Sequence, residues 1–144
     1  MKATDLALSQ FLGLRPAPPG ATHLLELPFT AELHNHLGTV HAAAQFALAE
    51  AASAECLQCR FGASAGPVRA VVRQAEVKYR QPASGDLLAY GTPDESTERD
   101  LLNDLANRHR ACAVILIDLK DRTGTLVFHG KFEWFISRLP SLST

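Results

Sequence analysis

The sequence of 144 residues lacks a long apolar segment and lacks any long run of charges of one sign. The longest apolar candidates are interrupted by Glu26, Glu50 or Asp118, which keeps them below the roughly 20 residues that span a bilayer. With 14 Lys and Arg against 15 Asp and Glu, the net charge is −1, and no basic patch for a phosphate backbone is indicated. We therefore expect neither a membrane partner nor a nucleic-acid partner.

The opening residues do not predict an export signal. The opening residues MKATDLALSQFLGLRP contain only short apolar stretches, broken by Asp5, Ser9 and Gln10, and no small-residue cleavage site follows them. This pattern favours a cytoplasmic protein.

Cysteine is scarce. Cys56, Cys59 and Cys112 are an odd number in a chain without an export signal, so a disulfide framework is not indicated. Cys56 and Cys59 form a CxxC pair, but structural zinc requires four ligands, and no second CxxC or correctly spaced His pair accompanies it. We expect two small residues near a helix end, and no metal site.

The 47% hydrophobic content is enough for one core, and the length leaves no room for a second domain. We expect a single domain over residues 1–144, in which residues 1–20 form an N-terminal helix, Ala3 to Leu14, and a proline-rich connector. The long central helix is expected from Val40 to about Cys56, with Thr39 as its N-cap. Its many alanines suit close packing against a sheet.

The remaining pattern is that of an antiparallel sheet. A Gly- and Ser-containing loop is expected from Phe61 to Pro67, and a short helix begins near Ser96 or Thr97. The predicted strands are Leu24 to Thr30, Val68 to Tyr79, Leu87 to Thr92, Ala111 to Leu119, and Thr125 to Ile136. Strands joined by hairpins around one helix predict the α+β class, with a curved antiparallel β-sheet wrapped around a long central helix.

One stretch carries the chemistry. It runs from Asn35 to Glu50, with Asn35 six positions before His41 and Glu50 nine positions after it. With the segment Val77 to Asp86, it resembles the hotdog-fold acyl-CoA thioesterases, particularly the PaaI-like and 4-hydroxybenzoyl-CoA thioesterase branch. The resemblance covers most of Leu24 to Ile136 and implies the hotdog fold.

The resemblance implies hydrolysis of acyl-CoA or acyl-carrier thioesters without a metal or organic cofactor. Glu50 is then the general base or nucleophile, and Asn35 positions water or the carbonyl. The backbone amides of Ala42 and Ala43 polarise the carbonyl from the helix N-terminus. The residues expected to bind substrate are His36, Gly38, His41 and Phe46.

Glu50 and Ala42 are about 12 Å apart along one helix, at 1.5 Å per residue. One chain therefore cannot bring both to the same thioester. In the resembling enzymes the site forms at a subunit interface, which implies a homodimer, and dimers that pair into a homotetramer are compatible with it.

Departures from the family pattern keep two other functions open. Ala42 and Ala43 replace the usual glycines, and Val71 and Val72 carry no hydroxyl where some relatives orient water. A non-catalytic module that binds acyl thioesters is therefore one alternative. A hotdog dehydratase that uses His36, fourteen positions before Glu50, is the other.

Overall fold

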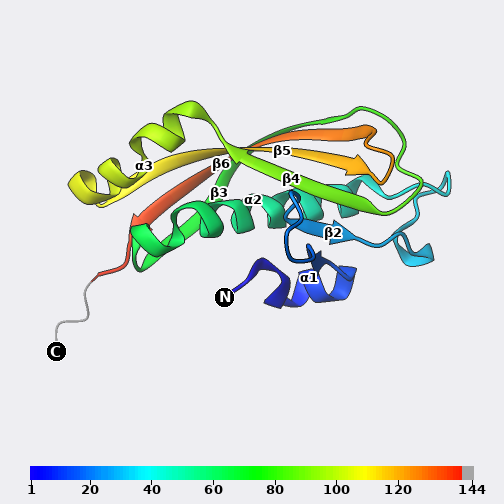
Figure 1. Cartoon of the computed structure of the whole chain (residues 1–144), viewed down its shortest axis with the longest axis horizontal. Helices are drawn as coiled ribbons and strands as arrows, with labels where there is room; N and C mark the ends of the chain where they lie inside the picture. The colour runs from blue at the N-terminus through cyan, green and yellow to red at the C-terminus, as the bar shows by residue number, and fades with distance from the viewer. Residues whose placement is uncertain (141–144) are drawn as a thin grey trace.

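The computed structural model describes residues 1–140 and contains one six-stranded antiparallel sheet (Figure 1). The strands lie in the order β1-β2-β4-β5-β6-β3. The elements are η1 (Ala3–Asp5), α1 (Ala7–Leu12), β1 (Arg15–Pro16), β2 (Leu25–Leu27), η2 (Ala31–Leu33), α2 (Ala42–Ala65), β3 (Val68–Tyr79), β4 (Leu87–Pro93), α3 (Glu95–Arg108), β5 (Arg110–Asp121) and β6 (Leu126–Arg138). The predicted α+β class is confirmed, and each of the five predicted strands has a counterpart, although the first is much shorter than predicted.

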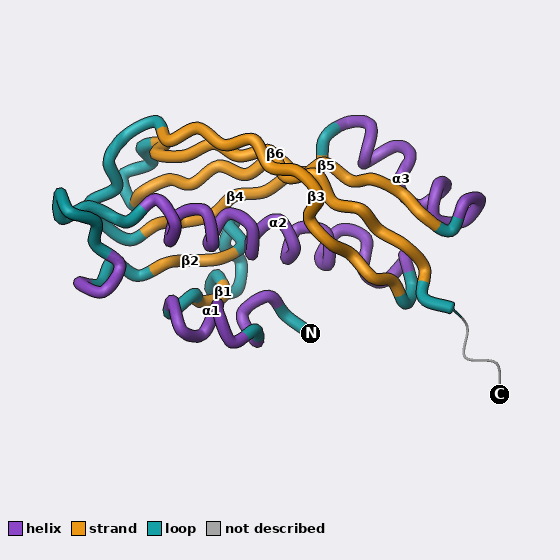
Figure 2. The backbone as a smooth tube through the Cα atoms, turned by 180° about the vertical axis from the view of Figure 1, so that it is seen from behind, coloured by secondary structure: helices purple, strands orange, loops and turns teal. Residues whose placement is uncertain are grey.

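The sheet curves around α2, and the N-terminal segment lies on the other side of this helix (Figures 1 and 2). Leu48, Ala49 and Ala52 of α2 are fully buried against the sheet. Gly91 of β4 allows this approach, because a Cβ at that position would lie 3.3 Å from the Cβ of Cys56 and 2.9 Å from Ile117. Small side chains on both surfaces therefore set the distance between helix and sheet.

The predicted bounds of the central helix were wrong at both ends. The helix begins at Ala42, and its N-cap is His41, not Thr39. It continues through the expected loop to Ala65, because Phe61 and Ala65 are buried and this tertiary packing outweighs the helix-breaking tendency of glycine. Pro67 sets the end, since the residue before a proline is disfavoured in helical conformation.

The N-terminal third is less regular than the pattern indicated. The first helix is divided into η1 and α1, and it ends at Gly13, which has φ +76°. The first long strand is confined to Leu25–Leu27. Pro28 cannot donate to a strand ladder, and the Phe29 N–H bonds instead to the Asp86 carboxylate at 2.8 Å.

Strand β3 forms an edge of the sheet. It pairs with β6 along its length, with a register shift between Val72 and Gln74 that explains the changing alternation of its sequence. On its other side it has no partner strand among residues 1–140. The β5–β6 hairpin turns at Gly124, whose φ of +86° is a left-handed conformation that glycine adopts without steric cost.

Within the described part of the chain, no helix combines the length and the apolar character that crossing a bilayer requires.

Candidate active site

The loop that precedes α2 is ordered by Asn35. Its Oδ1 accepts the backbone N–H groups of Leu37 at 2.9 Å and Thr39 at 3.1 Å, and its Nδ2 donates to the Thr39 hydroxyl at 2.8 Å. An isolated bridge between His34 and Val40 closes the loop at its base. The Asn35 side chain thus holds its own loop, as asparagine commonly does in turns.

The tip of this loop faces solvent. Gly38 adopts φ +75°, a left-handed conformation that glycine reaches without steric cost. His36 is exposed, and Leu37 is 73% exposed, a large fraction for an apolar side chain of this size. The loop therefore presents an imidazole and an apolar side chain to whatever approaches the start of α2.

The N-terminus of α2 has one backbone donor that is satisfied by a side chain and one that is free. The Ala43 N–H donates to Nδ1 of His41 at 3.0 Å. The Ala42 N–H finds no acceptor among residues 1–140. Of the two amides expected to polarise a carbonyl, only that of Ala42 is available in this arrangement.

Tyr79 was missed as a candidate by the sequence analysis. From the end of β3, its hydroxyl donates to the carbonyl oxygen of Ala42 at 3.1 Å, and partial burial raises the pKa of this phenol. In the sequence, the segment Val77 to Asp86 contributes only to the family resemblance. The pairing of β3 with β6, which the sequence does not reveal, brings Tyr79 to the start of α2.

Glu50 lies two turns further along α2 and is half-buried. Its carboxylate makes no hydrogen bond or ion pair with any group of residues 1–140, and desolvation by burial raises its pKa. A carboxylate that is desolvated and unpaired is a poor structural element, because burial of a charge is costly without a partner. Groups perturbed in this way are concentrated at functional sites.

A cavity of about 120 Å³ lies beside Glu50. Apart from Glu50 and Ser9, its wall is apolar, and its residues come from the N-terminal segment, from α2 and from Trp134 of β6. A reacting group that entered it would therefore meet the carboxylate in a poorly hydrated environment, where electrostatic interactions are stronger than in water.

The predicted site residues form two groups. Asn35, Gly38 and His41 lie in or next to the loop before α2, beside the amides of Ala42 and Ala43. Glu50 is separate from them, about 12 Å along the helix axis from Ala42.

Phe46, expected to contact substrate, packs edge-to-face on Phe132 at a centroid distance of 5.5 Å and borders the core. This contact explains why Phe46 is half-buried, and no contact with substrate is needed to explain it.

A buried hydrogen-bond chain supports the turn of α2 that carries Glu50. The Trp134 Nε1–H donates to the Ser53 hydroxyl at 3.0 Å, and this hydroxyl donates to the carbonyl oxygen of Glu50 at 2.7 Å. The chain fixes the helix turn relative to β6. A serine inside an alanine-rich helix was the only sequence signal for it.

The CxxC pair has no ligand geometry. Cys56 is buried against the sheet and Cys59 is exposed, so the two thiols have different surroundings. Burial raises the pKa of Cys56 to about 11, and burial together with Glu55 raises that of Cys59, which makes both poor nucleophiles. Among residues 1–140 no cluster of three or more His, Cys, Asp or Glu residues could hold a metal ion.

Comparison with known proteins gives a family and a fold. Residues 14–136 match the model described as a domain of unknown function, DUF4442. No curated protein matches the chain.

Several solved structures match closely in shape. A Pseudomonas aeruginosa protein of unknown function, described as a probable thioesterase, is 24% identical with a TM-score of 0.78, over 94% of this chain and 90% of that one. A Bacillus halodurans protein crystallised with CoA is 17% identical with a TM-score of 0.67, over 90% and 74%. A variant of a Staphylococcus aureus thioesterase is 14% identical with a TM-score of 0.69, over 92% and 99%. These matches confirm the predicted hotdog fold and the resemblance to proteins described as thioesterases.

Proposed function

The chain belongs to the DUF4442 family, and we propose that it hydrolyses acyl-CoA-type thioesters to a free acid and a thiol, with Glu50 as general base or nucleophile. The fold it shares with proteins described as thioesterases supports hydrolysis in general. The Bacillus halodurans relative in complex with CoA supports a CoA thioester as the substrate class.

The observation that carries the proposal is the state of Glu50. Hydrolysis needs a base that removes a proton from water as the oxygen attacks the thioester carbon, and the C–S bond then breaks to release the thiol. A carboxylate with no internal partner is free to accept that proton, and its raised pKa makes it a stronger base than an exposed carboxylate. The apolar cavity beside it suits an acyl group.

The electrophilic side of the reaction is assigned to the start of α2. The free N–H of Ala42 lies at the positive end of a 24-residue helix, where it can donate to the carbonyl oxygen as negative charge develops on it. Asn35 keeps the preceding loop in place and has one Nδ2 hydrogen left for water or the carbonyl. His36, Gly38 and His41 border the same loop and are proposed to contact the substrate.

The two halves of the site meet if the protein is a homodimer. Strand β3 offers an unpaired edge, and a two-fold axis beside it would join two sheets and place Glu50 of one protomer opposite the helix start of the other. Val71 on this edge is half exposed, and a partner protomer that packed against the edge would bury this apolar side chain. Light scattering at micromolar concentration should report a dimer or tetramer, and a monomer that hydrolyses thioesters would contradict the interface site.

A second comparison supports the pairing of Asn35 with Glu50. Two structures of the Staphylococcus aureus protein carry alanine in place of a glutamine or of a glutamate, and these two positions are fifteen residues apart in its sequence. Asn35 and Glu50 have the same spacing. Asn35 in the loop before α2 and Glu50 on α2 are likewise an amide and an acid at this separation.

The test is Glu50→Gln, measured by thiol release from a panel of short, long and aromatic acyl-CoAs. We expect kcat to fall by at least about 100-fold with a smaller change in KM, because the amide keeps the size of the side chain and loses its basicity. Glu95→Gln, an exposed position in the first turn of α3, is the matched control and should retain full activity. Equal turnover by wild type and Glu50→Gln would refute the assignment.

A non-catalytic module that binds acyl thioesters is the second candidate. The capped amide of Ala43 and the Asn35 side chain bound within its own loop favour it, because both reduce the number of free donors at the helix start. The same panel separates the two functions, since a binding module would bind acyl-CoA without releasing thiol.

A further inference from the structure

The cavity beside Glu50 adjoins a larger one. The second cavity has a volume of about 270 Å³, and it shares Ala3, Leu6, Ala54 and Trp134 with the first. The residues that α2 contributes recur every three or four positions from Ala47 to Ala65 and so lie on one face of the helix. The two cavities are therefore neighbours that together follow α2 for about 27 Å, at 1.5 Å per residue, and the pair is called the channel below.

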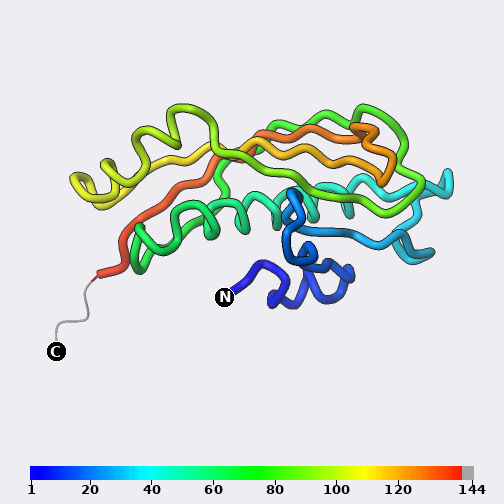
Figure 3. Tube along the Cα trace, in the orientation of Figure 1, coloured from blue at the N-terminus to red at the C-terminus, as the bar shows by residue number. Residues whose placement is uncertain are grey.

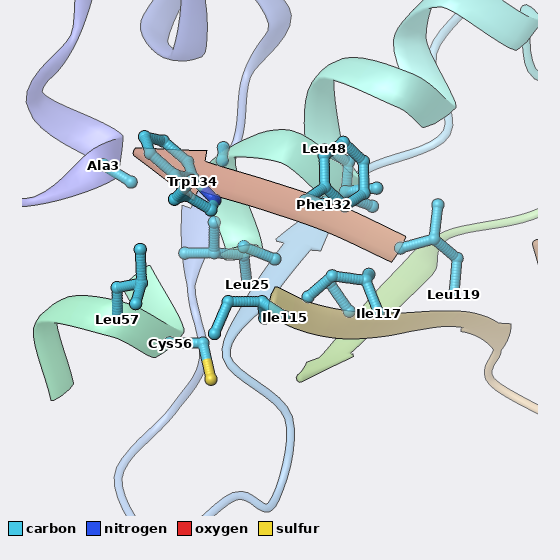
Figure 4. Close-up of a cluster of buried hydrophobic side chains, with 14 of the residues drawn as sticks. Ala3, Leu25, Leu48, Cys56, Leu57, Ile115, Ile117, Leu119, Phe132 and Trp134 are labelled. Carbon is cyan, nitrogen blue, oxygen red and sulfur yellow. The ribbon is translucent and has the colours of Figure 1, made fainter. Parts of the chain in front are cut away.

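The N-terminal segment covers this channel. It lies across α2 on the side away from the main part of the sheet (Figure 3). Its position is fixed by the backbone N–H of Ala3, which donates to the Glu55 carboxylate at 3.1 Å. Figure 4 shows Ala3 and Leu57 near Trp134, and all three residues border the larger cavity.

The wall beyond Glu50 is mainly apolar. Strand β3 contributes Val68 and Ala70, and α3 contributes Leu101 and Leu105. The polar side chains at its border are Lys2, Glu55 and Gln58, and the Glu55 carboxylate is occupied by the Ala3 N–H. Such a lining offers few hydrogen-bonding groups to a polar ligand and favours hydrocarbon.

We propose that this channel binds an unbranched aliphatic acyl chain, with the thioester at Glu50 and the tail between Trp134 and the N-terminal segment toward Phe61. The inference rests on the proposed function for the position of the thioester. Glu50 and Phe61 are about 16 Å apart along the helix, which suits an extended chain and exceeds the length of a single aromatic ring. Each methylene that enters the channel should raise affinity roughly three- to fourfold.

Trp134 allows binding to be measured without hydrolysis. It is the single tryptophan of the sequence, it is 7% exposed, and it borders both cavities. A twelve-carbon fatty acid brominated at its terminal carbon should quench the Trp134 fluorescence with saturation, and unbrominated dodecanoic acid should reverse the quenching. Bromoacetate, which has no long alkyl chain, is the control for collisional quenching of Trp134 from solution. Quenching by the long acid no stronger than that by bromoacetate would overturn the proposal.

Two substitutions in the wall of the channel, and one control outside it, test where the acyl chain binds. Ala54→Phe places a ring where the two cavities meet and should weaken quenching at least tenfold, whereas Ala63→Phe, on an exposed part of the same helix, should leave it unchanged. Ala70→Phe fills only the far cavity from an exposed position of β3. It should lower kcat/KM for dodecanoyl-CoA and spare butyryl-CoA. Because β3 is also the proposed dimer edge, light scattering checks that the variant keeps the oligomeric state of the wild type. The channel would be overturned if Ala54→Phe and Ala63→Phe changed the quenching equally, or if Ala70→Phe lowered kcat/KM equally for dodecanoyl-CoA and butyryl-CoA.

The two proposals fail in different ways. If wild type releases no thiol from any acyl-CoA while saturable quenching persists, the thioesterase proposal fails and the acyl channel stands. If wild type hydrolyses dodecanoyl-CoA and the brominated acid does not quench Trp134, the channel fails and the hydrolase stands.

Discussion

Replacing Ser53 by alanine should destabilise the protein through one buried hydrogen bond. Ser53 is fully buried, and its hydroxyl accepts the Trp134 Nε1–H at 3.0 Å. Alanine leaves this donor buried without a partner, which costs about 1–3 kcal/mol, and the better helix propensity of alanine returns about 0.5 kcal/mol. The net loss of about 0.5–2.5 kcal/mol corresponds to a decrease in Tm of about 1–10 °C for a chain of this size.

The assay is thermal unfolding followed by far-ultraviolet circular dichroism at one fixed protomer concentration, because association shifts Tm by mass action. A double-mutant cycle with Trp134→Phe isolates the hydrogen bond, since phenylalanine has no N–H group that could be left without a partner. In that background Ser53→Ala should cost less than about 0.5 kcal/mol, because the unsatisfied group is gone. An unchanged Tm for Ser53→Ala, or the same loss in both backgrounds, would refute the reasoning.

Three further predictions concern ionisation, capping and backbone conformation. Because burial raises the pKa of Glu50, the acidic limb of kcat/KM should lie above the ordinary value of 4.5, and Glu50→Gln should abolish this limb. The folded state binds that proton more tightly than the unfolded state, so stability should fall as pH rises from the unfolded to the folded pKa, and urea titrations of Glu50→Gln should lack this decrease. His41→Ala should cost about 1 kcal/mol in urea unfolding by leaving the Ala43 N–H uncapped, and His41→Asn should restore most of it. Gly124→Ala, at φ +86°, should cost about 1–2 kcal/mol by the same measurement.

The sequence specified the elements of the fold better than their ends. Strand β3 was predicted with its observed bounds, because a long β-rich run between Pro67 and Pro82 has clear limits. The end of α2 was missed, since its last turn contains Gly62 and two exposed residues, and burial of Phe61 and Ala65 keeps this turn helical. Local propensity carries no information about such tertiary contacts.

The candidate site, like the fold, could be predicted only where its residues lie close together in the sequence. The family resemblance indicated Asn35 and Glu50 through their offsets from His41, and it also implied their roles. Spacing could not reveal that the His41 ring caps the helix, or that Tyr79 reaches the Ala42 carbonyl from β3. Contacts between elements distant in sequence depend on strand order, which periodicity does not determine.

The position of β3 at the end of the sheet also bears on how the molecule assembles. Although β3 follows α2 directly in sequence, it pairs with β6, and β4, α3 and β5 lie between the two strands in the chain. The loop closed by this pairing is long, so its entropy must be lost before the contacts form, and such pairings fold slowly. The wall formed by Val68 and Ala70, together with Tyr79 beside the helix start, is therefore expected to appear late in refolding, after α2 has become helical.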